Sequence, residues 1–265
     1  MKRLIAIGIA AILMLSGVGA LAEAPLLDVV TGVRIEYPSA IVAGSVATSN
    51  FYVNGYDIIG LYLNDTGTVN EAAAEGKYLF LKLAYSTTPG YSAGKTLQYT
   101  GGINHRRAIH LDIRQQVNIT LKDGSIVGAN GFTNTGEMNV LVDDFLTITF
   151  ENPADGTLLN YRLFIPEGYA EKDEAQEKLP LVLFMHGAGE SGDNNASQIM
   201  GNPSALEFAT AEAQAEHPCF VMAPQKPHDV EHGWAEDKGT EDAPFYTTSF
   251  VLENVKLVID QLLVD

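Results

Sequence analysis

Residues 181–195 read LVLFMHGAGESGDNN, and the fold class follows from this stretch. Its first five residues are apolar without alternation, which is typical of a strand that is buried on both faces of a sheet. After His186 and Gly187, small residues let the backbone turn tightly, so that N–H groups point into a cavity rather than into a sheet. The pattern predicts a buried strand followed by a tight loop. An ordinary glycine-rich connection between a strand and a helix is the alternative interpretation.

The rest of the second half alternates between strands and helices. Strands are predicted at 159–166 (LNYRLFIP) and 219–224 (CFVMAP), with a helix-like segment at about 204–215 and an amphipathic segment at about 248–263. Alternation of this kind, with strands that are apolar on both faces, predicts a parallel or mixed sheet covered by helices. We therefore expect an α/β domain over residues 153–265. Its first residue lies within the turn-like sequence ENPADG, residues 151–156.

The residues before Pro153 follow a different pattern. Segments such as VRIEY, YLFLKLAY and AIHLDIRQQVNITL carry β-branched or aromatic residues at period two, and the turn sequences NG, DG and GG separate such segments. This pattern and the length of the region predict an all-β sandwich of the immunoglobulin-like type over residues 23–152.

The first 22 residues have the order of a secretory signal peptide. Lys2 and Arg3 precede an apolar run from Leu4 to about Val18, and Ala20-Leu21-Ala22 forms a small-x-small cleavage site. The apolar run is shorter than the roughly 20 residues that a membrane-spanning helix needs. We expect cleavage after Ala22, a secreted or extracytoplasmic location, and no stable membrane association of the cleaved chain.

The charge balance excludes several classes of partner. The chain has 16 Lys and Arg against 33 Asp and Glu, a net charge of −17, and loss of the leader would remove two basic residues and no acidic one. Such a field repels nucleic acid and anionic lipid, so we expect no nucleic-acid partner. The single cysteine, Cys219, lies in an apolar stretch, which favours a buried inert thiol and leaves no internal disulfide.

A metal site is not expected. His228 and His232 are four residues apart, and on a helix they could share a metal ion. Pro227 and Gly233 flank them and favour a loop, and no third ligand has a recognisable spacing. We expect neither a metal nor another cofactor.

Residues 90–94, GYSAG, match the G-x-S-x-G pattern around the nucleophile of many hydrolases. That serine works on a sharp turn from a strand into a helix, which exposes its hydroxyl beside a backbone N–H. Ser92 is followed by KTLQYTGG, which has the pattern of another strand. We interpret GYSAG as a hairpin or loop of the β domain.

Several of these segments together resemble a known family. YRLFIPEGY, LPLVLFMHGAGESGDNN, QAEHPCFVMAPQKP and the later Trp234 are similar to the start of secreted esterases of the α/β-hydrolase fold, relatives of polyhydroxyalkanoate depolymerases and feruloyl esterases. ITLKDGSIV and FTNTGEMNVLVDDF resemble the end of the immunoglobulin-like module that precedes the catalytic domain in that family. The resemblance implies ester hydrolysis on a small-molecule or polymeric ester, without a cofactor.

The resemblance also implies roles for the loop after the buried strand. A backbone N–H of Ala188 or Gly189 would bind the oxyanion of the tetrahedral intermediate. His186, Gly187 and Glu190 would support the loop, with His186 structural rather than the catalytic base. Ser191 is interpreted as a loop hydroxyl or helix cap, because it follows the loop too closely to be the nucleophile.

Further residues are candidates for a substrate pocket. Trp234 lies in a loop after the third strand, at the side of the sheet where ligands of α/β proteins bind, although ordinary packing would also explain it. Asn202 lies downstream of the oxyanion loop and could support it by hydrogen bonds, as could Gln198.

The catalytic triad itself is expected beyond residue 265. In this fold the order is Ser, then Asp or Glu, then His, and residues 193–265 contain only Ser197, Ser204 and Ser249, none within G-x-S-x-G. The sequence thus predicts an immunoglobulin-like domain followed by an incomplete α/β-hydrolase domain. A secreted non-catalytic binding protein that uses its β domain, and a serine peptidase of the same fold, are the alternatives.

Overall fold

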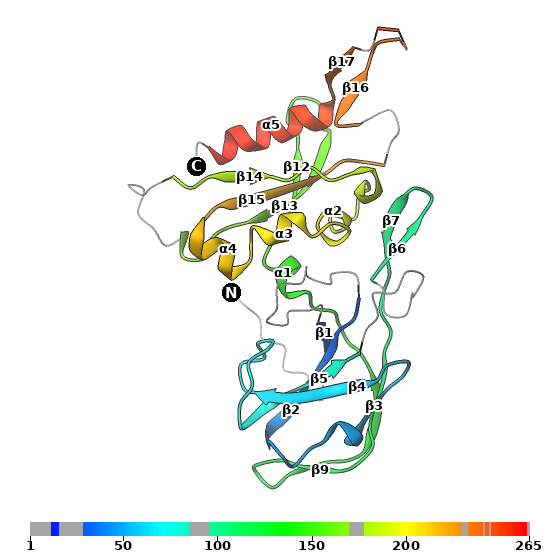
Figure 1. The fold of residues 1–265 in the computed structure, drawn as a ribbon, viewed down its shortest axis with the longest axis vertical. Helices are drawn as coiled ribbons and strands as arrows, with labels where there is room; N and C mark the ends of the chain where they lie inside the picture. Colours follow the sequence, from blue (N-terminus) through cyan, green and yellow to red (C-terminus); the bar gives the residue numbers. More distant parts are fainter. Residues whose placement is uncertain are drawn as a thin grey trace. The chain divides into compact units, whose positions relative to one another are not determined.

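The computed structural model describes residues 12–15, 29–84, 96–169, 178–228, 233–240, 242–243 and 245–263 (Figure 1). Residue contacts divide the chain into two units. The first unit comprises residues 1–96 and 107–140, and the second comprises residues 97–106 and 141–265.

The first unit is a β-sandwich built from antiparallel strand pairs. Its larger sheet has the order β1-β2-β5-β4, with β1 Ile12–Leu15, β2 Gly32–Val42, β4 Ile58–Asn64 and β5 Glu75–Leu83. A second sheet has the order β11-β8-β3, with β3 Phe51–Val53, β8 Asp112–Gln115 and β11 Asn130–Thr133. The 3-10 helix η1 (Thr48–Asn50) precedes β3, and β9 (Ile119–Thr120) pairs with β10 (Ile126–Val127). The immunoglobulin-like sandwich that the sequence predicts is therefore confirmed.

Alternation along the strands fills the sandwich core. Val33 and Ile35 of β2 are at most 1% exposed, and they share one hydrophobic cluster with side chains of the opposite sheet. These opposite residues include Phe51, Val53 and Ile113. Because side chains alternate between the two faces of a strand, residues at period two line the buried face.

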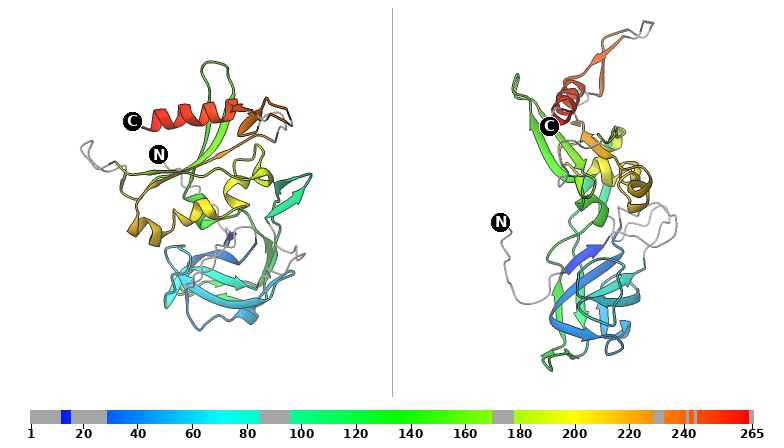
Figure 2. Two further views of the ribbon diagram at one scale, coloured as in Figure 1. Left: turned by 45° about the horizontal axis from the view of Figure 1, so that its top comes forward. Right: turned by 90° about the vertical axis from the view of Figure 1, so that its left-hand side faces the viewer.

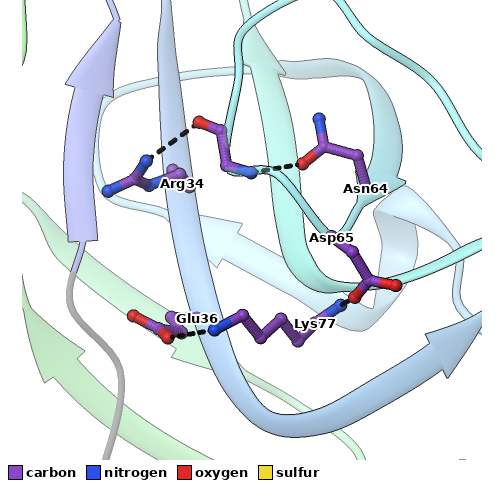
Figure 3. A network of polar contacts seen from close by, with 6 residues as sticks. Arg34, Glu36, Asn64, Asp65 and Lys77 are labelled. Atoms are coloured by element: carbon purple, nitrogen blue, oxygen red, sulfur yellow. Dashed lines mark hydrogen bonds and ion pairs between the residues drawn. The ribbon is translucent and has the colours of Figure 1, made fainter. Parts of the chain in front are cut away.

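A polar network fastens the connection between β4 and β5 to the sheet (Figure 3). The amide N–H of Gly67 donates to Asn64 Oδ1 at 2.8 Å, and Arg34 Nη1 of β2 donates to the Gly67 carbonyl at 2.9 Å. Nearby, Lys77 donates through its backbone N–H to Asp65 Oδ1 at 2.9 Å and through Nζ to Glu36 Oε1 at 3.1 Å. Gly67 has φ +75°, a conformation that favours glycine.

The second unit is built on a mixed four-stranded sheet of order β12-β13-β15-β14. Its strands are β12 Leu146–Glu151, β13 Leu158–Phe164, β14 Leu181–Leu183 and β15 Phe220–Gln225. β14 and β15 are parallel, whereas the β12–β13 and β13–β15 pairs are antiparallel. The sequence predicts a parallel or mixed sheet, and the structure shows the mixed type.

Helices cover both faces of this sheet (Figures 1 and 2). α5 (Phe250–Leu262) buries Val251, Val255 and Val258 against β13 and Met222 of β15. α2 (Ser197–Met200), α3 (Ser204–Glu207) and α4 (Ala211–Glu216) lie on the other side of the sheet (Figure 2). The unit also contains the turn α1 (Val140–Asp143), the hairpin β6–β7 (Leu97–Thr100 and Ile103–Arg106), the 3-10 helix η3 (Ala188–Glu190) and the hairpin β16–β17 (Ala235–Asp237 and Tyr246–Thr248).

The division between the units differs from the predicted boundary at residues 152 and 153. Asn152 to Thr157 form the turn of the β12–β13 hairpin, in which Asn152 N donates to the Thr157 carbonyl at 2.8 Å and Gly156 has φ +74°. The turn-like sequence ENPADG is therefore a turn within the second sheet, and it does not separate the two units. By contacts, residues 141–152 and 97–106 join the second unit.

Three local expectations also need adjustment. The helix-like segment 204–215 is two helices, because Thr210 caps α4 by accepting from Ala213 N at 3.2 Å. The strand predicted to be buried on both faces is β14, which lies at the edge of the sheet and is only partly buried, with Leu183 37% exposed. The segment NVLVDDFLTITF has β-branched and aromatic residues at period two, as a strand would, but it begins with the helical turn α1.

Candidate functional site

The loop after β14 presents two adjacent backbone N–H groups. Phe184 N donates to the Met222 carbonyl at 2.8 Å, and the chain then leaves the sheet and forms η3 from Ala188. The first N–H groups of a helix have no acceptor inside it. Those of Ala188 and Gly189 have no acceptor elsewhere in the described part of the chain, and Ala188 is exposed. The loop thus offers two donors to a group that approaches from solvent.

His186 is buried beneath this loop and both of its ring nitrogens are engaged. Lys226 N donates to Nε2 at 3.0 Å, so Nε2 is the unprotonated nitrogen, and Nδ1 lies 2.6 Å from the Gly187 carbonyl, to which it donates. Burial is the main cause that lowers the pKa of His186 to about 4, and the charge of Lys226 lowers it further. A neutral ring with both nitrogens in use is suited to holding the loop, and not to accepting a proton from a substrate.

Trp234 packs against this histidine. Its indole N–H donates to the His186 carbonyl at 3.0 Å, and the two rings meet edge to face with centroids 5.1 Å apart. The Ser249 hydroxyl donates to the Trp234 carbonyl at 3.0 Å, and this ties the start of α5 to the same place. These contacts make Trp234 a packing residue of the loop, and its role in a substrate pocket stays a prediction.

Two amides form the polar centre of the loop, and sequence reasoning missed both. Gln225, which is 2% exposed, accepts from Asn195 N at 2.7 Å and donates to the Glu190 carbonyl and to Asn194 Oδ1, each at 3.0 Å. Asn195 has φ +47° and donates through Nδ2 to the Ile148 carbonyl at 3.0 Å. The sequence signal for Asn195 was the pair Asn194-Asn195 shortly after Gly192, because asparagine tolerates the left-handed backbone conformation of turns.

The other residues that were predicted to support the loop are also engaged in hydrogen bonds or in the helix η3. Glu190 accepts from Gln225 through its carbonyl, and Gly187 is the N-cap of η3. Gln198 is fully buried and donates to Asn195 Oδ1 at 2.6 Å, while its Oε1 has no partner in the described residues. Asn202 accepts from the backbone N and the hydroxyl of Ser204, at 3.0 and 2.7 Å, so its side-chain oxygen is engaged at the first residue of α3.

Each serine hydroxyl of the second unit donates a hydrogen bond within the fold. Ser191 donates to the Ala188 carbonyl at 2.8 Å, Ser197 to the Asn104 carbonyl at 3.0 Å and Ser204 to Asn202 Oδ1, while Ser249 donates to the Trp234 carbonyl. None of these four serines donates to a histidine, which an activated nucleophile requires. Ser92 and the GYSAG motif lie outside the described residues, but the strand predicted to follow them is present as β6.

The other candidate features give little support for a functional site. Within the described ranges, no three His, Cys, Asp or Glu residues are grouped so that they could hold a metal ion, and His232 lies outside those ranges. Cys219 is buried as predicted. Among the helices that the structure describes, none is long and apolar enough to cross a membrane. In the first unit, a polar cavity of about 320 Å³ is lined by Tyr52, Asn54, Asp112, Arg114 and Gln116.

Comparisons with known proteins agree with this architecture. Residues 28–128 match the family described as the esterase Ig-like N-terminal domain. A solved structure described as a thermostable esterase superposes with a TM-score of 0.77 at 30% sequence identity, covering 96% of this chain. The chain spans 66% of the length of that esterase. No curated protein sequence matches the chain.

Proposed function

We propose that the chain contributes the oxyanion loop of a serine esterase, starting from the match of residues 28–128 to the esterase Ig-like N-terminal domain. The pair of N–H groups at Ala188 and Gly189, which have no acceptor in the described residues, carries this proposal. A second support is the likeness of the whole chain to a thermostable esterase.

In the proposed reaction, a serine hydroxyl attacks the carbonyl carbon of a carboxylic ester while a histidine accepts its proton. The N–H groups of Ala188 and Gly189 donate to the oxygen that becomes negative, and the histidine then passes the proton to the departing alcohol. Water hydrolyses the resulting acyl-serine and releases the acid. We place the nucleophile, the acid and the base outside residues 1–265, because the serines of the second unit are engaged in the fold.

Export is part of the proposal, and it rests on the sequence of the first 22 residues. β1 lies inside this segment, so cleavage after Ala22 would remove the strand that pairs with residues 32–35 of β2. N-terminal sequencing of the protein recovered outside the cytoplasm should begin at Glu23. An intact N-terminus on the exported protein would contradict cleavage.

A proline substitution tests the oxyanion role. Ala188 is the first residue of η3, a position that accepts proline and loses only the N–H. In the gene product that contains residues 1–265 together with the nucleophile, Ala188→Pro should lower kcat for p-nitrophenyl butyrate about 100-fold or more, with little change in KM. Ala211→Pro, the same change at the first residue of α4, is the matched control and should leave kcat unchanged.

Two results would contradict the proposal. Full activity in Ala188→Pro would remove the loop from the oxyanion site. Hydrolysis by residues 1–265 alone, abolished by Ser92→Ala or Ser191→Ala, would place the nucleophile within this chain instead.

A further inference from the structure

The β6–β7 hairpin joins the second unit although its sequence lies within the family match at residues 28–128. Its two-residue turn is Gly101-Gly102, with φ +60° and +88°, the conformation that a tight antiparallel hairpin favours. The register pairs Leu97 with Arg106 and Tyr99 with Asn104. Because side chains alternate along a strand, these four side chains share one face of the hairpin.

That face lies against the candidate oxyanion loop and α2. The Ser197 hydroxyl at the start of α2 donates to the Asn104 carbonyl at 3.0 Å. Arg106 Nη1 lies 3.7 Å from Met200 Sδ at the end of the same helix. The hairpin is therefore attached to the segment that follows η3 at two points.

Two glycines allow the approach. A Cβ on Gly189 would lie 3.3 Å from Tyr99 Cε2, and a Cβ on Gly201 would lie 2.9 Å from Asn104 Nδ2. Such distances are shorter than ordinary van der Waals contact, so a side chain at either position would require the facing side chain of Tyr99 or Asn104 to move. The Tyr99 ring consequently lies directly beside the backbone of Gly189, one of the two proposed oxyanion donors.

Tyr99 is otherwise little used by the fold. Its side chain is 67% exposed, and within the described residues its hydroxyl has no hydrogen-bond partner. An aromatic ring of this kind offers a large rigid apolar surface to a ligand. An ester whose carbonyl oxygen accepted from Gly189 N–H would bring its acyl chain or its alcohol group towards the Tyr99 ring, which lies beside Gly189.

We propose that Tyr99 is a specificity-determining residue, which contacts the apolar part of the ester bound at the Ala188–Gly189 donors. The inference rests on the proposed function of that loop. The β6–β7 hairpin, whose sequence lies within the match to the immunoglobulin-like domain, then forms one wall of the substrate site.

The test uses residues 1–265 and unbranched 2-alkanones, whose carbonyl accepts hydrogen bonds but is not hydrolysed. Amide resonances of Ala188 and Gly189 are followed by NMR as 2-butanone, 2-hexanone and 2-octanone are added. In the wild type, affinity should rise with chain length because each buried CH₂ adds to binding. Tyr99→Ala should bind 2-octanone about tenfold more weakly, with 2-butanone nearly unchanged.

Two matched variants complete the design. Tyr99→Phe keeps the ring and should keep the dependence on chain length. Tyr52→Ala removes an exposed tyrosine of the first unit and should behave as the wild type. Since Tyr99 is exposed, an unchanged melting temperature should accompany its loss.

The outcomes separate the two proposals. Ketones that shift neither amide in the wild type would overturn the oxyanion role, and the role of Tyr99 with it. Shifted amides with the same dependence on chain length in Tyr99→Ala would overturn the role of Tyr99 alone.

Discussion

At the scale of single residues, the loop depends on a histidine that must remain neutral. His186 accepts from Lys226 N and donates to the Gly187 carbonyl, and this arrangement fixes one tautomer. Protonation of Nε2 would set N–H against N–H and would bring a charge into a buried place. The imidazole therefore holds the loop only in its neutral form.

This predicts a pH dependence of stability. The folded-state pKa is about 4 and the unfolded value is 6.5, so the unfolded chain binds the extra proton first as the pH falls. The contribution of His186 to the free energy of unfolding is complete above the unfolded pKa. It should fall by about 2 kcal/mol between pH 7.5 and pH 5.

Urea unfolding of the wild type and of His186→Gln between pH 7.5 and pH 5 measures the effect. Glutamine can donate and accept but does not titrate in this range. The difference between the two proteins should shrink as the pH falls. Parallel curves would show that protonation of His186 does not govern this part of the profile.

At the scale of elements, α5 is fastened to the sheet by a narrow valine stripe. Val255 is 2% exposed within the cluster that includes Leu159 and Met222, whereas Leu257 on the same helix is 37% exposed. Val255→Ala should lower the free energy of unfolding by about 2 kcal/mol, because it removes buried methyl groups and leaves a cavity. Leu257→Ala is the control and should cost about 0.5 kcal/mol or less. Equal losses in chemical denaturation would contradict the packing of this face.

The strand pattern allowed both folds to be predicted, because period-two alternation and strands apolar on both faces are local signals. The boundary between the two units was harder to predict from the sequence. ENPADG has the composition of a linker and of a hairpin turn alike, and only the pairing of Leu146 with Leu163 decides between them. Turn chemistry specifies a change of direction, but it does not specify which sheet the chain enters next.

The candidate site, like the fold, could be predicted from the sequence only in part. The residues at 186–190 were predicted because a tight loop after an apolar strand leaves a signature of small residues, although that strand, β14, lies at the edge of the sheet and is only partly buried. Gln225 and Tyr99 were not predicted as site residues, because they reach the loop from strands distant in sequence. Contacts between distant segments leave no periodic trace in a single sequence.

At the scale of the whole molecule, charge repulsion is the dominant long-range term. The chain has a net charge of −17, and ion pairs such as Lys77–Glu36 and Lys122–Glu75 join side chains that are each about 40% exposed or more. Exposed pairs contribute little, whereas the excess negative charge opposes the compact state. Raising NaCl from 10 to 300 mM should therefore increase stability by roughly 1 kcal/mol, since the Debye length shortens.

Thermal unfolding at neutral pH across this salt series tests the prediction, with a neutral osmolyte of matched osmolality as the control. The osmolyte should reproduce little of the increase. A melting temperature that falls with salt would mean that local ion pairs outweigh the general repulsion.

The position of Trp234 has an optical consequence. The chain has a single tryptophan, and its indole N–H is bonded to the carbonyl of His186, directly under the loop. Emission from this one fluorophore therefore reports on the surroundings of the loop, without a background from other tryptophans. Movement of the loop, protonation of the histidine beside the ring and loss of the packing under it can all be followed in time on the unlabelled protein.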